Sequence, residues 1–211
     1  MQPRDRKGIA ARVAADIPEG WVVNLGIGIP TLIGLVLPKD REIILQSENG
    51  VIGFGPPDNP PDPWMINASK EPIGEIAGMA MVHHADSFAM IRGGHIDLCV
   101  LGAFEVAANG DLANWATSAN DLAPAVGGAM DLAAGAKRIW ITMEHTTKDG
   151  RPKIVRQLGY PPTGLGCVRR IYTNLAVIDV TPAGLEVVEM VPGLTFEALQ
   201  AQTDAPLHMA A

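Results

Sequence analysis

Short, nearly uninterrupted apolar runs alternate with helix-like segments along the chain, and this alternation limits the fold more than any other feature. Apolar residues dominate 21–25, 98–101 and 138–143, as in strands that are covered by helices on both faces. Between them, 4–16 carries apolar residues every four positions and 127–134 is rich in small residues, as expected of short helices. The pattern predicts an α/β fold with a largely parallel central sheet flanked by helices.

Turn signals refine this prediction toward the C-terminus. The segments 171–179 and 185–190 flank the turn sequence Pro182-Ala183-Gly184 and predict an antiparallel strand pair. Asn109-Gly110 lies between two further apolar segments and predicts a hairpin. Asp86 is expected to cap a helix that runs through Ile91.

A proline-rich segment interrupts the first half of the chain. Five of the eleven residues from 54 to 64 are proline, which excludes a regular strand or helix there. The composition is unchanged on either side, so we expect a loop that leaves and re-enters one domain spanning 1–211. The chain is 47% hydrophobic, which is enough for a sizeable core.

The net charge and the cysteine content indicate which partners and which cellular compartment to expect. The formal charge of −7 disfavours nucleic acid or an anionic membrane as the main partner. The uncharged stretch 20–38 is interrupted by glycine, asparagine and proline, so we expect a strand, a turn and a helix rather than a membrane span. Cys99 and Cys167 have no metal or disulfide spacing and are expected to be small apolar residues in a reducing cytoplasm.

Two glycine segments and one histidine pair are further candidate sites. Residues 26–30 follow a strand but lack the third glycine of a dinucleotide-binding loop, so a turn that brings the backbone near a site is favoured over NAD binding. Gly127-Gly128 offers unobstructed backbone N–H groups, although simple helix punctuation is the alternative. His83-His84 would point apart on a strand and have no third ligand, so no metal site is expected.

Glu48 is the strongest candidate for chemistry. It follows the buried strand expected over 41–46 and precedes Asn49-Gly50, so it lies on a tight turn at a strand end, where open α/β sheets bind ligands. A carboxylate in such a place can attack an activated acyl carbon as a nucleophile. A turn cap or an ion pair is the alternative interpretation.

The surroundings of Glu48 resemble a known signature. Residues 45–53, Leu-Gln-Ser-Glu-Asn-Gly-Val-Ile-Gly, resemble the glutamate motif of the family I coenzyme A transferases, in particular the beta subunits of 3-oxoacid and 3-oxoadipate CoA-transferases. Five further blocks resemble the family in the same order, at 24–30, 87–97, 110–115, 127–132 and 142–146.

The resemblance implies a ping-pong mechanism without a metal or a tightly bound cofactor. Glu48 would form an acyl-glutamyl anhydride and then a glutamyl-CoA thioester, so coenzyme A is both substrate and covalent intermediate. Gly128 would face the oxyanion of each tetrahedral intermediate. The other residues that it implies near CoA are Gly127, Asn114, Lys70 and Gly28.

The resemblance also implies a partner and leaves alternatives open. A companion alpha subunit is expected, in a heterodimer or heterotetramer, with succinyl-CoA as donor and an acetoacetate- or 3-oxoadipate-type acid as acceptor. The segment 116–126 departs from the family because it lacks two lysines and contains Asp121. An acyl-CoA hydrolase or ring-opening hydrolase on the same fold, and a non-catalytic ligand-sensing domain, are the alternatives.

Overall fold

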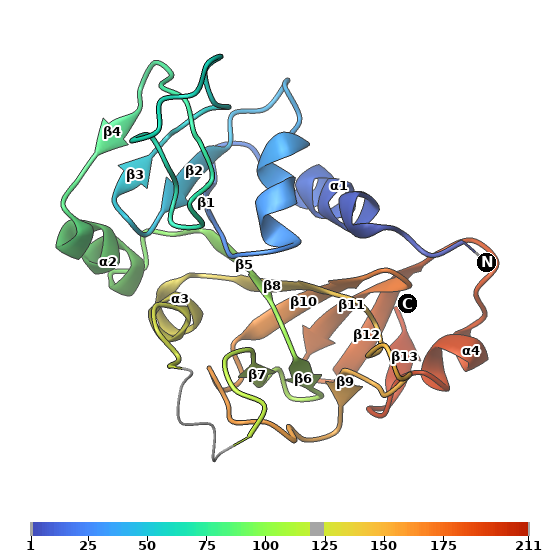
Figure 1. Ribbon diagram of the computed structural model, residues 1–211. Coiled ribbons are helices and arrows are strands. Elements are labelled where there is room, and N and C mark those ends of the chain that lie inside the picture. The colour runs from blue at the N-terminus through green and yellow to red at the C-terminus, as the bar shows by residue number, and fades with distance from the viewer. Residues whose placement is uncertain (1, 119–124, 211) are drawn as a thin grey trace.

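A ten-stranded mixed sheet forms the centre of the molecule in a computed structural model that describes residues 2–118 and 125–210. Its strand order is β13-β12-β11-β10-β8-β5-β1-β2-β3-β4, and the five strands from β10 to β2 are mutually parallel (Figure 1). These five strands are β1 (Val22–Leu25), β2 (Ile44–Ser47), β5 (Leu98–Gly102), β8 (Ile139–Met143) and β10 (Val168–Thr173). The predicted fold class, with a largely parallel centre, is confirmed.

Further strands extend the parallel centre on both sides, and those on the C-terminal side begin with an antiparallel pair. β11 (Ala176–Thr181) and β12 (Gly184–Met190) form the predicted C-terminal antiparallel pair, and β13 (Leu207–Met209) adds to it in parallel. The single strand predicted over 171–179 is wrong, because the chain turns between β10 and β11. The hydroxyl Oγ1 of Thr173 accepts hydrogen bonds from the backbone N–H groups of Leu175 and Ala176, which closes this turn.

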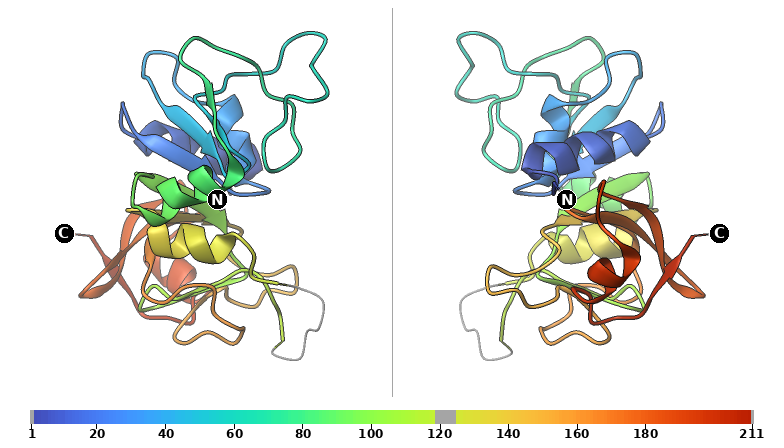
Figure 2. Two further views of the ribbon diagram at one scale, coloured as in Figure 1. Left: turned by 90° about the vertical axis from the view of Figure 1, so that its left-hand side faces the viewer. Right: turned by 90° about the vertical axis from the view of Figure 1, so that its right-hand side faces the viewer.

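Helices cover both faces of the sheet. α1 (Arg6–Asp16) and the 3₁₀ helix η1 (Pro30–Leu35) lie on one side, and α2 (His84–Arg92) and α3 (Ala129–Gly135) lie on the other (Figures 1 and 2). Residues of β5 alternate between the two cores: Leu98 and Val100 pack with α1, whereas Cys99 and Leu101 pack on the opposite side. This explains the continuous apolar run, since a strand buried on both faces has no polar face. The last helix is α4 (Phe196–Gln200).

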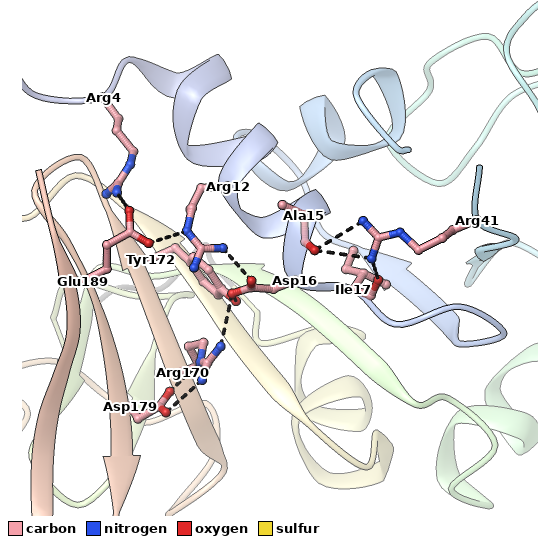
Figure 3. Close-up of polar contacts among 10 residues, drawn as sticks. All are labelled: Arg4, Arg12, Ala15, Asp16, Ile17, Arg41, Arg170, Tyr172, Asp179 and Glu189. Atoms are coloured by element: carbon pink, nitrogen blue, oxygen red, sulfur yellow. Dashed lines mark hydrogen bonds and ion pairs between the residues drawn. The ribbon is translucent and has the colours of Figure 1, made fainter. Parts of the chain in front are cut away.

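An ion-pair network holds α1 against the sheet (Figure 3). Asp16, at the end of α1, pairs with Arg12 and Arg170 and accepts a hydrogen bond of 2.8 Å from the hydroxyl of Tyr172. Glu189 on β12 pairs with Arg4 and Arg12. The network joins the N-terminal helix to β10 and β12 and thereby fixes the position of the helix at one side of the sheet.

α2 begins earlier than predicted. Its cap is His83, whose Nδ1 accepts a hydrogen bond from the backbone N–H of Ala85, and not Asp86, which lies in the first turn. The expectation that His83 and His84 lie on a strand is therefore wrong. An imidazole nitrogen has replaced the carboxylate oxygen that more often caps a helix.

The proline-rich segment lies in a long loop between β3 (Val51–Ile52) and β4 (Ala80–Met81), which pair with each other. Figure 2 shows this loop projecting from one end of the molecule. The loop therefore leaves and re-enters the sheet between two paired strands. No helix in the described ranges is long and apolar enough to cross a bilayer.

A second, three-stranded sheet lies beside the first. It contains β6 (Glu105–Ala107), β7 (Leu112–Ala113) and β9 (Ile154–Val155). β6 and β7 pair antiparallel around Asn109-Gly110, so the predicted hairpin is confirmed.

Candidate active site

A pocket of about 640 Å³ opens at the carboxyl ends of the parallel strands β1, β2, β5 and β8. Parallel strands end at the same edge of a sheet, so residues far apart in the sequence meet there. The structure brings four of the predicted site residues into the lining of this pocket, namely Glu48, Gly28, Asn114 and Gly128. We call it the strand-end pocket.

Glu48 lies on a tight turn between β2 and β3. The turn is closed by a hydrogen bond of 3.0 Å from the Gly50 N–H to the Ser47 carbonyl. Gly50 has φ +112°, and a Cβ atom on it would lie 2.3 Å from the carbonyl oxygen of Val82. Any residue with a side chain would therefore strain or displace the turn that carries the carboxylate.

A buried amide holds the Glu48 carboxylate. Nδ2 of Asn24 donates to Oε2 of Glu48 at 3.1 Å and to Oε1 of Gln46 at 2.8 Å. Nε2 of Gln46 in turn donates to the Ser87 hydroxyl at 2.8 Å. Sequence reasoning marks Asn24 only as an interruption, although a polar residue inside an apolar strand is the signal that could have identified it.

Cys99 completes this polar cluster behind the glutamate. Its Sγ lies 3.6 Å from Oδ1 of Asn24. Burial raises the pKa of the thiol well above its usual value, and the negative charge of Glu48 raises it further. The thiol therefore stays protonated and can donate to Asn24, whose amide is left oriented with its N–H₂ toward the carboxylate.

The loop after β1 brings bare backbone to the pocket. The N–H of Gly26 donates to the Val100 carbonyl at 2.9 Å, and a Cβ atom on Gly26 would lie 3.1 Å from Cδ2 of Leu101. Gly28 has φ +96° and faces open space. As predicted, this segment is a strand-to-helix turn beside Glu48.

Gly128 caps the start of α3 and lines the pocket, whereas Gly127 is not among the lining residues. A Cβ atom on Gly128 would lie 3.2 Å from Cζ of Phe88, so a larger residue would push against α2. Gly127 has φ +56°, a conformation that favours glycine. Asp121, in the segment that departs from the family, lies outside the described residues.

Asn114 and Lys70 have different surroundings. Asn114 joins two loops: its Nδ2 donates to the Gly102 carbonyl at 3.2 Å, and its Oδ1 accepts from the Thr163 hydroxyl at 2.7 Å. Lys70 is exposed and does not line the pocket. Its segment is nevertheless tied to the Glu48 turn, because the N–H of Ala68 donates to the Ser47 hydroxyl at 2.9 Å.

Three lining residues on the β8 side of the pocket were not among the predicted site residues: Thr142, Glu144 and Lys153. Thr142 and Glu144 belong to the block 142–146 that resembles the family, whereas Lys153 lies outside every such block. Thr142 is the penultimate residue of the fully buried strand β8, and Lys153 lies in a later segment whose backbone N–H donates to the His145 carbonyl just after this strand. No sequence pattern relates Lys153 to Glu48, because 105 positions and the turns of the sheet separate them. Only the folded chain places both on one pocket.

A second hollow, of about 740 Å³, lies against α1 and the outer strands and includes Trp21, Arg138 and Arg170 in its lining. Its two carboxylates, Asp16 and Asp179, are both paired with Arg170. Their pairing leaves them poorly suited to nucleophilic attack. The strand-end pocket, with the accessible carboxylate of Glu48, is therefore the candidate active site.

Fold and pocket together define an α/β protein with a pocket of small-molecule size at the carboxyl edge of a parallel sheet, beside a glutamate that a buried amide holds. Residues 6–202 match the family model described as Coenzyme A transferase. The chain therefore belongs to the coenzyme A transferase family, and it is a chain of a CoA-transferase.

Curated relatives agree with this assignment, and a solved structure shares the fold. The chain is 59% identical over 204 residues to the B subunit of the 3-oxoadipate CoA-transferase of Acinetobacter baylyi, covering 96% of this chain and 94% of that protein. It is 44% identical over 202 residues to the B subunit of a probable succinyl-CoA:3-ketoacid coenzyme A transferase of Bacillus subtilis, covering 95% and 93%. An acyl-CoA transferase apoenzyme from Escherichia coli O157:H7 shares the fold with a TM-score of 0.76 at 23% identity, covering 98% of this chain and 42% of that one.

Proposed function

We propose that this chain is the catalytic beta subunit of a 3-oxoacid CoA-transferase that moves CoA from succinyl-CoA to an acetoacetate- or 3-oxoadipate-type acid. The observation that carries the proposal is the Glu48 carboxylate, which lines the strand-end pocket and accepts a hydrogen bond from buried Asn24. The names of the relatives at 59% and 44% identity support the choice of substrates.

The first half-reaction loads CoA onto the enzyme. An Oε atom of Glu48 attacks the thioester carbonyl and the C–S bond breaks. CoA departs as a thiolate, and an acyl-glutamyl anhydride remains on the enzyme. The thiolate then attacks Cδ of Glu48, the anhydride C–O bond breaks, and the donor acid leaves as a carboxylate. Glu48 is now a CoA thioester, and no water or net proton has been consumed.

The second half-reaction runs these steps in reverse with the acceptor. The carboxylate of the 3-oxoacid attacks Cδ of the glutamyl thioester and releases CoA thiolate, which gives a new mixed anhydride. The thiolate attacks the acceptor carbonyl, and Glu48 leaves as a carboxylate. Acceptor acyl-CoA dissociates and the free enzyme is restored.

Neighbouring groups have assigned roles in this proposal. Asn24 orients the glutamate in its carboxylate form, since its amide can only donate to it from Nδ2. The backbone N–H of Gly128 stabilises the oxyanion of each tetrahedral intermediate, a contribution of about 3 to 4 kcal/mol for one such donor. Gly28, Gly127, Asn114 and Lys70 contact CoA.

The proposal includes a partner and a compartment. The relatives are named as B subunits, and we propose that an alpha subunit completes the acyl pocket in a heterodimer or heterotetramer. CoA thioesters are intracellular metabolites, so the cytoplasm is the expected compartment.

Glu48→Gln tests the proposal in the assembled complex. The variant keeps the shape and the acceptor oxygen for Asn24 but has no nucleophile, so CoA transfer between succinyl-CoA and a 3-oxoacid should fall by at least about 1,000-fold. Glu42→Gln, which changes an exposed carboxylate just before β2, is the matched control and should keep wild-type activity.

Two results would contradict the proposal. Glu48→Gln could retain full transfer activity, which would exclude a glutamyl intermediate. The wild-type complex could instead release CoA at its full rate without any acceptor acid, which would indicate a hydrolase.

A further inference from the structure

The wall of the strand-end pocket opposite Glu48 is polar. Thr142 lies at the end of β8, and Glu144 and Lys153 line the pocket beside it. The backbone of Lys153 is held there from both sides: its N–H donates to the His145 carbonyl at 3.3 Å, and its carbonyl accepts from the Val106 N–H at 2.9 Å. The backbone position of this lysine is thus set by the residue His145, shortly after β8, and by Val106 on β6.

Two polar groups on this wall lack a hydrogen-bond partner among the residues that the structure describes. Within the described part of the chain, Nζ of Lys153 makes no hydrogen bond or ion pair, and the Thr142 hydroxyl is buried without a hydrogen bond. Burial lowers the pKa of the Lys153 ammonium, and the charge of Glu144 only partly opposes this effect. Buried hydroxyls are normally hydrogen-bonded, and a half-buried ammonium without an ion-pair partner loses hydration without compensation, so both groups favour an anionic or polar ligand here.

The distance across the pocket suits a small diacid. β1 and β5 separate β2 from β8 in the sheet, so Glu48 and the β8 wall are three strand spacings apart, or about 14 Å. The side chains of Glu48 and Lys153 each shorten this gap by several ångströms. A six-carbon chain with five C–C bonds spans roughly 6 Å when extended.

We infer that Lys153 is a specificity-determining residue, whose ammonium binds the second carboxylate of a dicarboxylic 3-oxoacid while the first carboxylate reacts at Glu48. This inference rests on the proposed function and adds the substrate class that the pocket selects. 3-Oxoadipate is a dicarboxylic 3-oxoacid and succinate is a diacid without the oxo group, whereas acetoacetate has no second carboxylate to bind.

Lys153→Met in the assembled complex tests the inference with two matched acceptors. 3-Oxoadipate and 3-oxohexanoate have the same six-carbon chain and differ in the terminal carboxylate. The wild-type complex should prefer 3-oxoadipate, and the variant should raise KM for 3-oxoadipate by at least about 10-fold, the usual effect of losing one hydrogen bond to a charged group. KM for 3-oxohexanoate and kcat for both acids should change by less than about 2-fold.

Lys148→Met is the control, because this exposed lysine lies in the same loop outside the pocket lining. It should leave both KM values at the wild-type level. Lys153→Arg keeps the charge and should recover most of the preference for 3-oxoadipate.

The inference is overturned if Lys153→Met raises KM for both acids equally, as a role in folding or in binding CoA phosphate would require, or if it changes neither. The labelling of Glu48 by succinyl-CoA, the proposed donor, separates this failure from that of the proposed function. If Glu48 of the wild-type complex forms a CoA thioester, the proposed function stands whatever the acids show. If it never does, that function fails first.

Discussion

Replacing Asn24 by alanine should loosen the catalytic glutamate and destabilise the fold together. The change removes the 3.1 Å hydrogen bond to Oε2 of Glu48 and the 2.8 Å bond to Oε1 of Gln46. A hydrogen bond to a charged group is worth about 1.5 to 3 kcal/mol, and a buried acceptor left unpaired costs about 1 to 3 kcal/mol. Glu48 is only half-buried, so the lower part of the first range applies.

We therefore expect Asn24→Ala to lower the free energy of unfolding by about 2 to 4 kcal/mol. For a chain of this length, that loss lowers Tm by roughly 5 to 15 °C. The rate at which acyl-CoA labels Glu48 should fall about 10- to 100-fold, because a misplaced nucleophile loses its alignment with the thioester. Urea unfolding and stopped-flow labelling measure the two effects separately.

Asn24→Asp provides the isosteric comparison. It replaces the donating amide with a carboxyl group that burial and the Glu48 charge would hold at a raised pKa in the folded chain, against about 3.9 when unfolded. The folded state then binds this proton more tightly, so the variant's stability is greatest below pH ~4 and falls as the pH rises. The assigned role of Asn24 is wrong if the free energy of unfolding of Asn24→Ala lies within about 0.5 kcal/mol of the wild-type value and acyl-CoA labels its Glu48 at the wild-type rate.

Two further predictions concern the framework of the site. Gly50 has φ +112°, and a Cβ atom on it would lie 2.3 Å from the carbonyl oxygen of Val82. Gly50→Ala should therefore lower the free energy of unfolding, measured in urea, by about 2 to 4 kcal/mol and abolish the labelling of Glu48. A change in the free energy of unfolding below about 0.5 kcal/mol would refute the turn geometry. His145, whose burial lowers its pKa from 6.5 to about 4, binds more protons when unfolded, so the protein should lose about 3 kcal/mol of stability as the pH falls from 6.5 to 4. His145→Gln should remove this pH-dependent loss in urea titrations, and an unchanged slope would show that another group causes it.

Local patterns predicted the centre of the fold well. The apolar runs 98–101 and 138–143 indicated strands buried on both faces, and both correspond to strands in the parallel centre of the sheet, β5 and β8. The segment 171–179 misled the prediction because its apolar composition continues through the turn. That turn depends on the Thr173 hydroxyl, which bonds two backbone N–H groups, and composition does not reveal such a bond.

Some residues of the candidate site could also be predicted from local sequence patterns, and others could not. Glu48, Gly28 and Gly128 could be predicted because each lies at a strand end or helix start with a recognisable local motif, and the structure lines one pocket with all three. Asn24 was visible only as a polar residue in an apolar strand. Lys153 could not be predicted, since its place in the pocket depends on backbone contacts with His145 and Val106.

The most direct test of the account is the mass of the peptide that contains Glu48 after the assembled complex is incubated with acyl-CoA and no acceptor. We predict that this peptide gains the mass of a CoA thioester and that hydroxylamine converts Glu48 to a hydroxamate, while Glu48→Gln gains neither. CoA transfer at the wild-type rate without any modification of Glu48 would contradict the account.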